Sequence, residues 1–76
     1  MIYTYRVTID GKKVVHVDSS KAKSAVNFAM VDSGIQSAEY VMASRVENGI
    51  LIADRFYCSC FIADDESLVF EESHSF

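Results

Sequence analysis

The sequence predicts an α+β fold: an antiparallel sheet of four to five strands with one helix packed on one face, in the order ββαββ and with an optional edge strand at the end. Three observations predict it. Residues 2–9 alternate apolar and polar side chains, which is typical of a half-buried strand, and residues 13–17 return as a second strand after a turn. Residues 22–30 carry apolar side chains at helical spacing. Residues 39–57 return to alternation around Asn48-Gly49, a strong hairpin signal.

The first two strands are joined by a turn at Asp10-Gly11. The length of this loop matters, because a slip of one residue turns every apolar side chain to the wrong face. A three-residue loop, Ile9-Asp10-Gly11, gathers the apolar side chains on one face, with Gly11 in the left-handed conformation of a bulge. This register predicts the pairs Val7 with Lys13, Tyr5 with Val15 and Tyr3 with Val17.

A helix is expected next, between N-cap candidates at Asp18, Ser19 and Ser20 and a C-terminal Gly34. Phe28 lies off its apolar stripe, as does Val31. The stripe consists of small residues that allow a close approach to the sheet: Ala22, Ala25, Val26, Ala29 and Met30.

The second hairpin is predicted to turn through a three-residue loop, Glu47-Asn48-Gly49, by the same argument from side-chain faces. Its solvent face then carries Arg45, Glu47 and Arg55. Its core face carries Tyr40, Met42, Val46, Ile50, Ile52 and Phe56, with Ser44 and Asp54 as polar exceptions.

The rest of the single domain, residues 1–76, is expected to be short strands and turns. Residues 58–63 form a fifth strand or continue the fourth past a bend, and residues 67–71 form the optional edge strand. Residues 72–76 are expected to be a loose tail. Because the helix covers one face of the sheet, the other face stays open and is the natural place for a partner.

The sequence contains none of the common phosphate-loop, nucleophile-elbow or zinc-protease motifs. Cys58 and Cys60 are expected on one side of a strand, as buried reduced thiols. Zinc would need four ligands, and only His16 and His74 could complete the set. We therefore expect no enzyme activity, no catalytic residue, no cofactor and no metal.

Charge is unevenly distributed along the chain, whose net charge is −4. Residues 1–30 hold five basic and two acidic residues, whereas residues 31–76 hold two basic and nine acidic residues. Two acidic clusters near the C-terminus could imitate the phosphates of a nucleic acid and bind a basic partner. The alternative is a solvated acidic surface that maintains solubility. The clusters consist of Asp64, Asp65, Glu66, Glu71 and Glu72.

Two further groups of residues are candidates for binding. Lysines in the first turn of the helix oppose its macrodipole, which suggests an anionic partner; the alternative is lysines that point into water. The possible anion contacts are Lys12, Lys13, Lys21 and Lys23. Phe28 and Val31, off the core stripe, are candidate anchors for a protein partner or a second copy, because one helix cannot cover all the aromatic side chains.

The chain contains a strand, then D-S-S-K-A-K-S-A-V-N-F-A as helix start, then E-Y-V-M-A-S-R-V-E-N-G-I-L-I-A as hairpin. This order resembles the layout of several small phage-encoded type I anti-CRISPR proteins. The resemblance covers about residues 1–56 and lies in the architecture, without a shared diagnostic motif. It implies a non-enzymatic inhibitor that binds a host CRISPR effector complex and blocks target DNA binding or nuclease recruitment.

We accordingly expect an acidic protein inhibitor, monomeric or homodimeric, in the cytoplasm of a bacterial host. No run approaches ~18 apolar residues and no signal peptide is evident, so no membrane contact is expected. The negative charge argues against direct nucleic-acid binding. Two alternatives stay open: a self-associating interaction module, and a small regulator that contacts nucleic acid through the four lysines.

Overall fold

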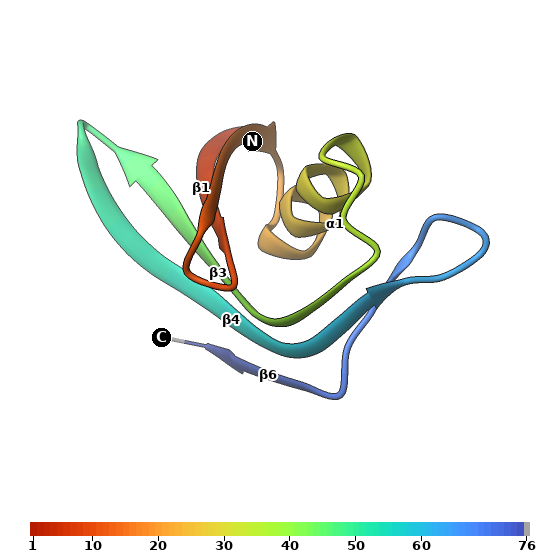
Figure 1. Cartoon of the computed structure of the whole chain (residues 1–76). Coiled ribbons are helices and arrows are strands. Elements are labelled where there is room, and N and C mark those ends of the chain that lie inside the picture. The colour runs from red at the N-terminus through yellow and green to blue at the C-terminus, as the bar shows by residue number, and fades with distance from the viewer. Residues whose placement is uncertain (76) are drawn as a thin grey trace.

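The computed structural model describes residues 1–75, in which an antiparallel sheet of six strands curls around one side of a single helix (Figure 1). This confirms the predicted α+β class, with one strand more than expected. The elements are β1 (Tyr3–Ile9), β2 (Lys13–Ser19), α1 (Ala22–Asp32), β3 (Ser37–Glu47), β4 (Ile50–Ile62), β5 (Leu68–Val69) and β6 (Glu72–Ser75). The strand order is β2-β1-β3-β4, and both β5 and β6 pair with the outer edge of β4.

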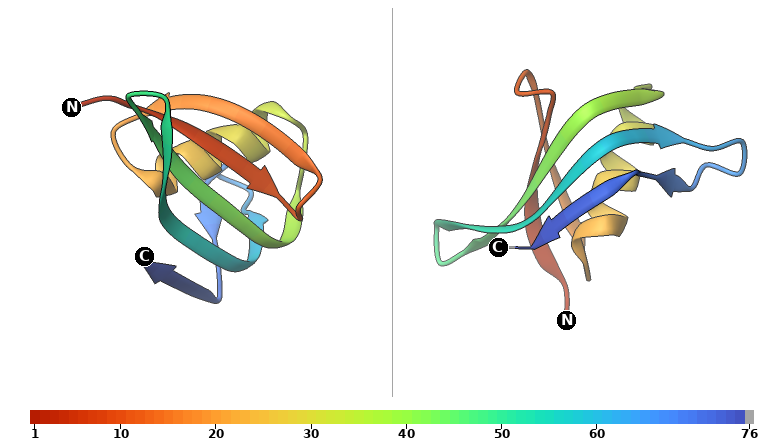
Figure 2. Two further views of the ribbon diagram at one scale, coloured as in Figure 1. Left: turned by 90° about the vertical axis from the view of Figure 1, so that its left-hand side faces the viewer. Right: turned by 90° about the horizontal axis from the view of Figure 1, so that it is seen from below.

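The helix lies on the concave side of the sheet, as the two views in Figure 2 show. No described element covers the other side, which we call the uncovered face. Between helix and sheet lies one hydrophobic core. Its buried side chains are Tyr5, Val7, Ile9, Val17, Ala22, Ala25, Val26, Ala29, Met30, Ala38, Val41, Ala43, Tyr57, Cys60 and Leu68.

The first hairpin has a three-residue turn, as predicted, but the turn is Asp10-Gly11-Lys12. Val7 therefore pairs with Val15 rather than Lys13, a shift of two residues that leaves every side chain on its predicted face. Contacts with β3 explain the shift. The Asp10 carboxylate accepts hydrogen bonds from the backbone N–H groups of Glu39 (2.8 Å) and Tyr40 (3.1 Å), which hold Asp10 beyond the end of β1.

The helix starts without the predicted side-chain cap. Its N-cap residue is Lys21, whose backbone is extended and whose side chain makes no capping hydrogen bond. Asp18 instead accepts a hydrogen bond from the Thr4 hydroxyl at 2.8 Å, and the Ser19 hydroxyl donates to the Lys21 carbonyl at 3.2 Å. The first turn thus holds lysines and no acidic residue, against the macrodipole.

The other end of the helix agrees with the sequence. Gly34 has a φ of +69°. Its N–H donates to the Val31 carbonyl (3.1 Å) and the Ile35 N–H donates to the Met30 carbonyl (2.9 Å), which is a Schellman motif. All five members of the predicted core stripe are buried, while Phe28 and Val31 are exposed as predicted.

The second hairpin differs from the prediction. Its turn has two residues, Asn48 and Gly49, with φ of +52° and +77°, so that Glu47 pairs with Ile50. Positive φ at both central positions is the type I′ geometry that matches the twist of the two strands. A bulge beside Ala43 then shifts the register by one residue further along the hairpin.

The apolar face predicted for this hairpin is divided in the structure and does not form the core: Ile50 and Ile52 lie on the helix side but are exposed, and the other four members lie on the uncovered face. β3 pairs with β1 so that Val41 lies beside Ile9 and Ala43 beside Val7, and these two β3 side chains pack under the helix. Alternation then turns Tyr40, Met42 and Val46 to the uncovered face. Arg45, predicted to face solvent, points to the helix side, as does Arg55.

The C-terminal third agrees with the prediction in one point and differs from it in two. The agreement is that β4 continues through Ile62, as one of the two predicted alternatives has it. Ser59 has a φ of +52°, which breaks the alternation: Tyr57 and Cys60 are both in the core, so Cys58 and Cys60 point to opposite faces and not to the same one. We expected a loose tail over residues 72–76, yet Glu72–Ser75 form β6; Phe76 lies outside the described residues.

Within residues 1–75, no helix is long and apolar enough to cross a membrane.

Candidate functional site

The uncovered face carries an apolar stripe along the two central strands. Met42 pairs with Phe56 and Val46 pairs with Leu51. The rings of Tyr40 and Phe56 stack with centroids 5.9 Å apart and planes inclined by 19°. Tyr40 is 42% exposed and Leu51 47% exposed, so the stripe is in contact with solvent.

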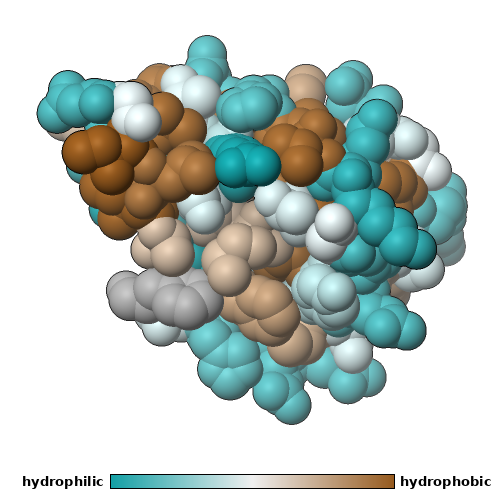
Figure 3. Space-filling model, turned by 60° about the vertical axis from the view of Figure 1, so that its left-hand side comes forward, coloured by the Kyte–Doolittle hydropathy of each residue, from teal (hydrophilic) through white to brown (hydrophobic). Residues whose placement is uncertain are grey.

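The stripe runs onto the tip of the β3–β4 hairpin, which extends past the helix (Figure 1). Three successive aliphatic residues follow the turn there and point to alternate sides: Ile50 is 64%, Leu51 47% and Ile52 36% exposed. Met1 and Ile2, also exposed, lie at the same end of the sheet, because β1 begins beside the end of β3. In Figure 3 the hydrophobic side chains gather over this hairpin, at the upper left.

The local sequence explains why the hairpin projects. Asn48-Gly49 forms a tight turn without help from the rest of the chain. The β-branched Val46, Ile50 and Ile52 flank the turn, and the strands pair with each other from Glu47 and Ile50 inward. The helix has 11 residues and stays over the middle of the sheet. The last turn of the hairpin therefore has no described partner.

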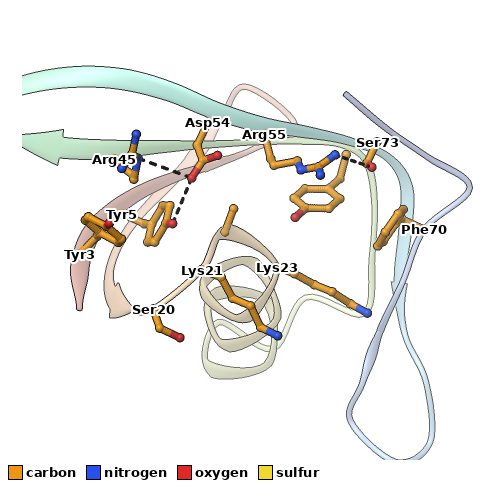
Figure 4. A pocket seen from close by; sticks show the side chains of 12 residues that line it. Tyr3, Tyr5, Ser20, Lys21, Lys23, Arg45, Asp54, Arg55, Phe70 and Ser73 are labelled. Atoms are coloured by element: carbon orange, nitrogen blue, oxygen red, sulfur yellow. Dashed lines mark hydrogen bonds and ion pairs between the residues drawn. The ribbon is translucent and has the colours of Figure 1, made fainter. Parts of the chain in front are cut away.

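A second candidate site is a hollow of about 490 Å³ where the helix begins, shown in Figure 4. It lies between the first turn of α1, the strands β1, β3 and β4, and the C-terminal segment. Four basic side chains and one carboxylate line it: Lys21, Lys23, Arg45, Arg55 and Asp54.

One wall of this hollow is a closed polar network. The Tyr5 hydroxyl donates to Asp54 Oδ2 at 3.0 Å, and Arg45 Nε lies 3.6 Å from the same oxygen. Arg45 also pairs with Glu47 at 3.0 Å and lies over the ring of Tyr3, 4.9 Å from its centroid. Burial, followed by the hydrogen bond to Asp54, raises the pKa of Tyr5 to about 12. Tyr5 is therefore a neutral hydrogen-bond donor at physiological pH.

The opposite wall carries the free positive charge. Arg55 Nη1 donates to the Ser73 hydroxyl at 3.1 Å, and Lys23 Nζ lies 5.7 Å from the centroid of the Phe70 ring. Among the described residues, neither of these cations nor Lys21 has a carboxylate within ion-pair distance. This wall could accept an anionic group from a ligand or a partner.

The predicted anion contacts do not form one surface. Lys21 and Lys23 line the hollow, whereas Lys12 and Lys13 lie in and beside the β1–β2 turn, at the opposite end of β2. Arg55 was missed because the sequence argument placed it on the solvent face of its strand.

The predicted acidic clusters are also divided. Asp64, Asp65 and Glu66 lie in the turn before β5, and hydrogen bonds from Ser67 lower the pKa of Asp65. Glu66 shares a shallow surface hollow with Phe28 and Val31, so the structure brings these three predicted contacts together. The other acidic pair, Glu71 and Glu72, follows β5, and Glu72 contacts His74.

Comparison with known proteins gives no family for this chain: no protein-family model, no curated protein and no solved structure matches it.

Proposed function

We propose that the protein is a non-enzymatic binding domain that docks on a partner protein through the uncovered face and the tip of the β3–β4 hairpin. The observation that supports this is the apolar stripe of Tyr40, Met42, Val46, Leu51 and Phe56 on a face that no described element covers. Apolar side chains that gather on an uncovered face, here on either side of the Ser44–Ala53 pair, are typical of an interface.

The hairpin tip can supply part of the binding free energy that a micromolar complex needs. Complete burial of an exposed aliphatic side chain contributes about 1.5–3 kcal/mol. The three aliphatic residues at the hairpin tip are each about half exposed. A partner that wraps around the tip and buries Leu51 on the uncovered face together with Ile50 and Ile52 on the helix side would gain about 2–4 kcal/mol from them. A micromolar complex needs roughly 8 kcal/mol. The tip would therefore act as an anchor, and the stripe behind it would supply the rest.

We further propose that the partner is a host nucleic-acid-handling complex of the CRISPR effector type, which the protein inhibits. The support for this partner is the sequence layout and the strong negative charge of residues 31–76. Net negative charge would speed association with a basic surface and favour it over acidic ones. The acidic clusters are divided: Asp64, Asp65 and Glu66 lie beyond the end of β4 that is opposite the hairpin tip, with Glu66 beside the helix. We therefore assign these clusters a long-range electrostatic role, and not contacts at the apolar anchor or one continuous imitation of a nucleic acid.

The test is target-DNA binding by a type I effector complex in the presence of excess protein. We expect the affinity for DNA, or the recruitment of the nuclease, to fall with wild-type protein. Leu51→Glu, which places a charge in the proposed anchor, should weaken the effect at least tenfold. Phe28→Glu, at the helix anchor that the sequence predicts and that this proposal replaces, should retain it. Unchanged DNA binding and nuclease recruitment at saturating protein would exclude this partner.

Self-association is the second candidate, because an apolar face can also bury itself against a second copy. Sedimentation over a concentration series distinguishes the two. A dimer that Leu51→Glu converts to monomer would favour self-association, whereas a wild-type monomer at all concentrations would leave the face free for another protein.

A further inference from the structure

The edge of the sheet at β6 holds a group of side chains that the proposed function does not use. Glu72 of β6 pairs with Cys58 of β4, and His74 pairs with Phe56. Ser73, between Glu72 and His74, points to the helix side, where Arg55 donates to its hydroxyl. Glu72 and His74 therefore both point to the uncovered face, and so does Cys58, whose neighbour Tyr57 is in the core.

The ligand atoms of these three residues converge. The Cys58 sulfur, a Glu72 carboxylate oxygen and a His74 ring nitrogen all lie within 4.8 Å of one another. His74 Nε2 and Glu72 Oε2 are 3.4 Å apart. Atoms bound to one tetrahedral zinc ion at its usual bond lengths are about 3.3–3.6 Å apart. The histidine–glutamate pair already has this spacing, and the sulfur has to approach the other two atoms by at most about 1.2–1.5 Å, within reach of side chains at a sheet edge.

We propose that Cys58, Glu72 and His74 form a zinc-binding site that fastens β6 to β4. One sulfur, one imidazole nitrogen and one carboxylate oxygen are all ligands that zinc accepts, and the thiolate with the imidazole disfavours magnesium and calcium. With thiolate and carboxylate as ligands, the two negative charges balance Zn²⁺. A fourth ligand would have to come from water or a partner.

The surroundings suit this role. The Phe56 ring lies beside the His74 imidazole, with centroids 6.4 Å apart, and limits its orientations. The ladder between β4 and β6 has four residue pairs, Arg55–Ser75 to Cys58–Glu72. A metal ion bound to both strands would therefore add a crosslink where the backbone pairing is short. Cys60 belongs to the core and is not a ligand, which is why spacing in the sequence does not indicate the site.

The site can be tested on the isolated full-length protein, independently of any partner. Cobalt(II) is the probe, because a thiolate bound to cobalt gives a charge-transfer absorption band in the near ultraviolet. We expect one cobalt ion per chain with this band, displacement by zinc, and a higher melting temperature when zinc is added.

Two variants test the ligands and a third is the control, each checked for folding by circular dichroism. Cys58→Ser should remove the band, and His74→Ala should weaken zinc binding at least tenfold in competition with a chromophoric chelator. His16→Ala, which removes an exposed histidine of β2, is the matched control and should bind as wild type does. The proposal is overturned if wild-type protein gives no stoichiometric band, if the band survives in Cys58→Ser, or if His16→Ala loses as much affinity as His74→Ala.

Discussion

Replacement of Tyr5 by phenylalanine tests the polar network that closes one wall of the basic hollow. Tyr5 is 2% exposed, and its hydroxyl makes a 3.0 Å hydrogen bond to the Asp54 carboxylate. Asp54 keeps Arg45 as a partner and is partly open to water, so the loss of this bond should cost about 1 kcal/mol at pH 7. In a domain of this size that lowers the melting temperature by roughly 4–8 °C.

The same variant makes a prediction about alkaline pH. The pKa of Tyr5 rises from 10.0 to about 12 on folding. A raised pKa in the folded state means that the neutral phenol stabilises the fold below pH 10, and that this contribution is lost as the pH rises from about 10 to 12. Two pKa units correspond to about 2.7 kcal/mol. Wild type therefore loses stability over this window that Tyr5→Phe does not lose.

The assay is urea unfolding of both proteins at several pH values between 7 and 12. Because the variant starts about 1 kcal/mol lower and wild type then loses more, we expect the two stability curves to cross near pH 11. Stability curves that coincide at pH 7, or that run parallel through pH 12, would show that the Tyr5 hydroxyl does not stabilise the fold through its hydrogen bond to Asp54.

Three substitutions and one control, Val31→Ala, test the helix and its packing by urea unfolding. Lys21→Ser supplies the missing N-cap side chain at an extended residue and should stabilise the protein by about 1 kcal/mol. No gain would mean that the N–H groups of the first helical turn already have other hydrogen-bond partners. Met30→Ala opens a cavity in the core and should cost about 2–5 kcal/mol, whereas Val31→Ala on the exposed side should cost less than about 1 kcal/mol. Similar costs for both would place Met30 outside the core. Gly34→Ala meets no neighbouring atom, so its expected cost of about 1 kcal/mol comes from φ alone, and a neutral result would contradict the left-handed cap.

The helix could be predicted from the sequence because its signals are local. The spacing of Ala22, Ala25, Val26, Ala29 and Met30 depends only on helical geometry, and the left-handed cap depends on one glycine. The faces of β1 and β2 could also be predicted, since the alternation of β1 sets its core face and a register shift of two residues leaves every paired side chain on the same face.

The face of the second hairpin could not be predicted from alternation alone. The argument assumed that its more apolar face is the core face, but the core beneath the helix takes Val41 and the small Ala43, which β1 selects by pairing. The larger Tyr40 and Met42 are left on the outside. The same misplacement hid the role of Arg45, which pairs with Asp54 on the helix side.

The group at β6 could not be predicted because it depends on pairing between distant parts of the chain. Cys58 lies opposite Glu72 only because β6 returns along the edge of β4. The left-handed conformation of Ser59, which separates Cys58 from Cys60, has no signal in the residue type, since serine rarely adopts it.

The central claim is that the protein binds its partner through the uncovered face. Hydroxyl-radical footprinting of the protein in complex with the partner that it binds tests this claim most directly, because it reports the exposure of individual side chains. We predict that Tyr40, Leu51 and Phe56 become protected while Phe28 reacts as in the free protein. Protection of Phe28 with unchanged reactivity at Tyr40 and Leu51 would contradict the claim and place the interface on the helix.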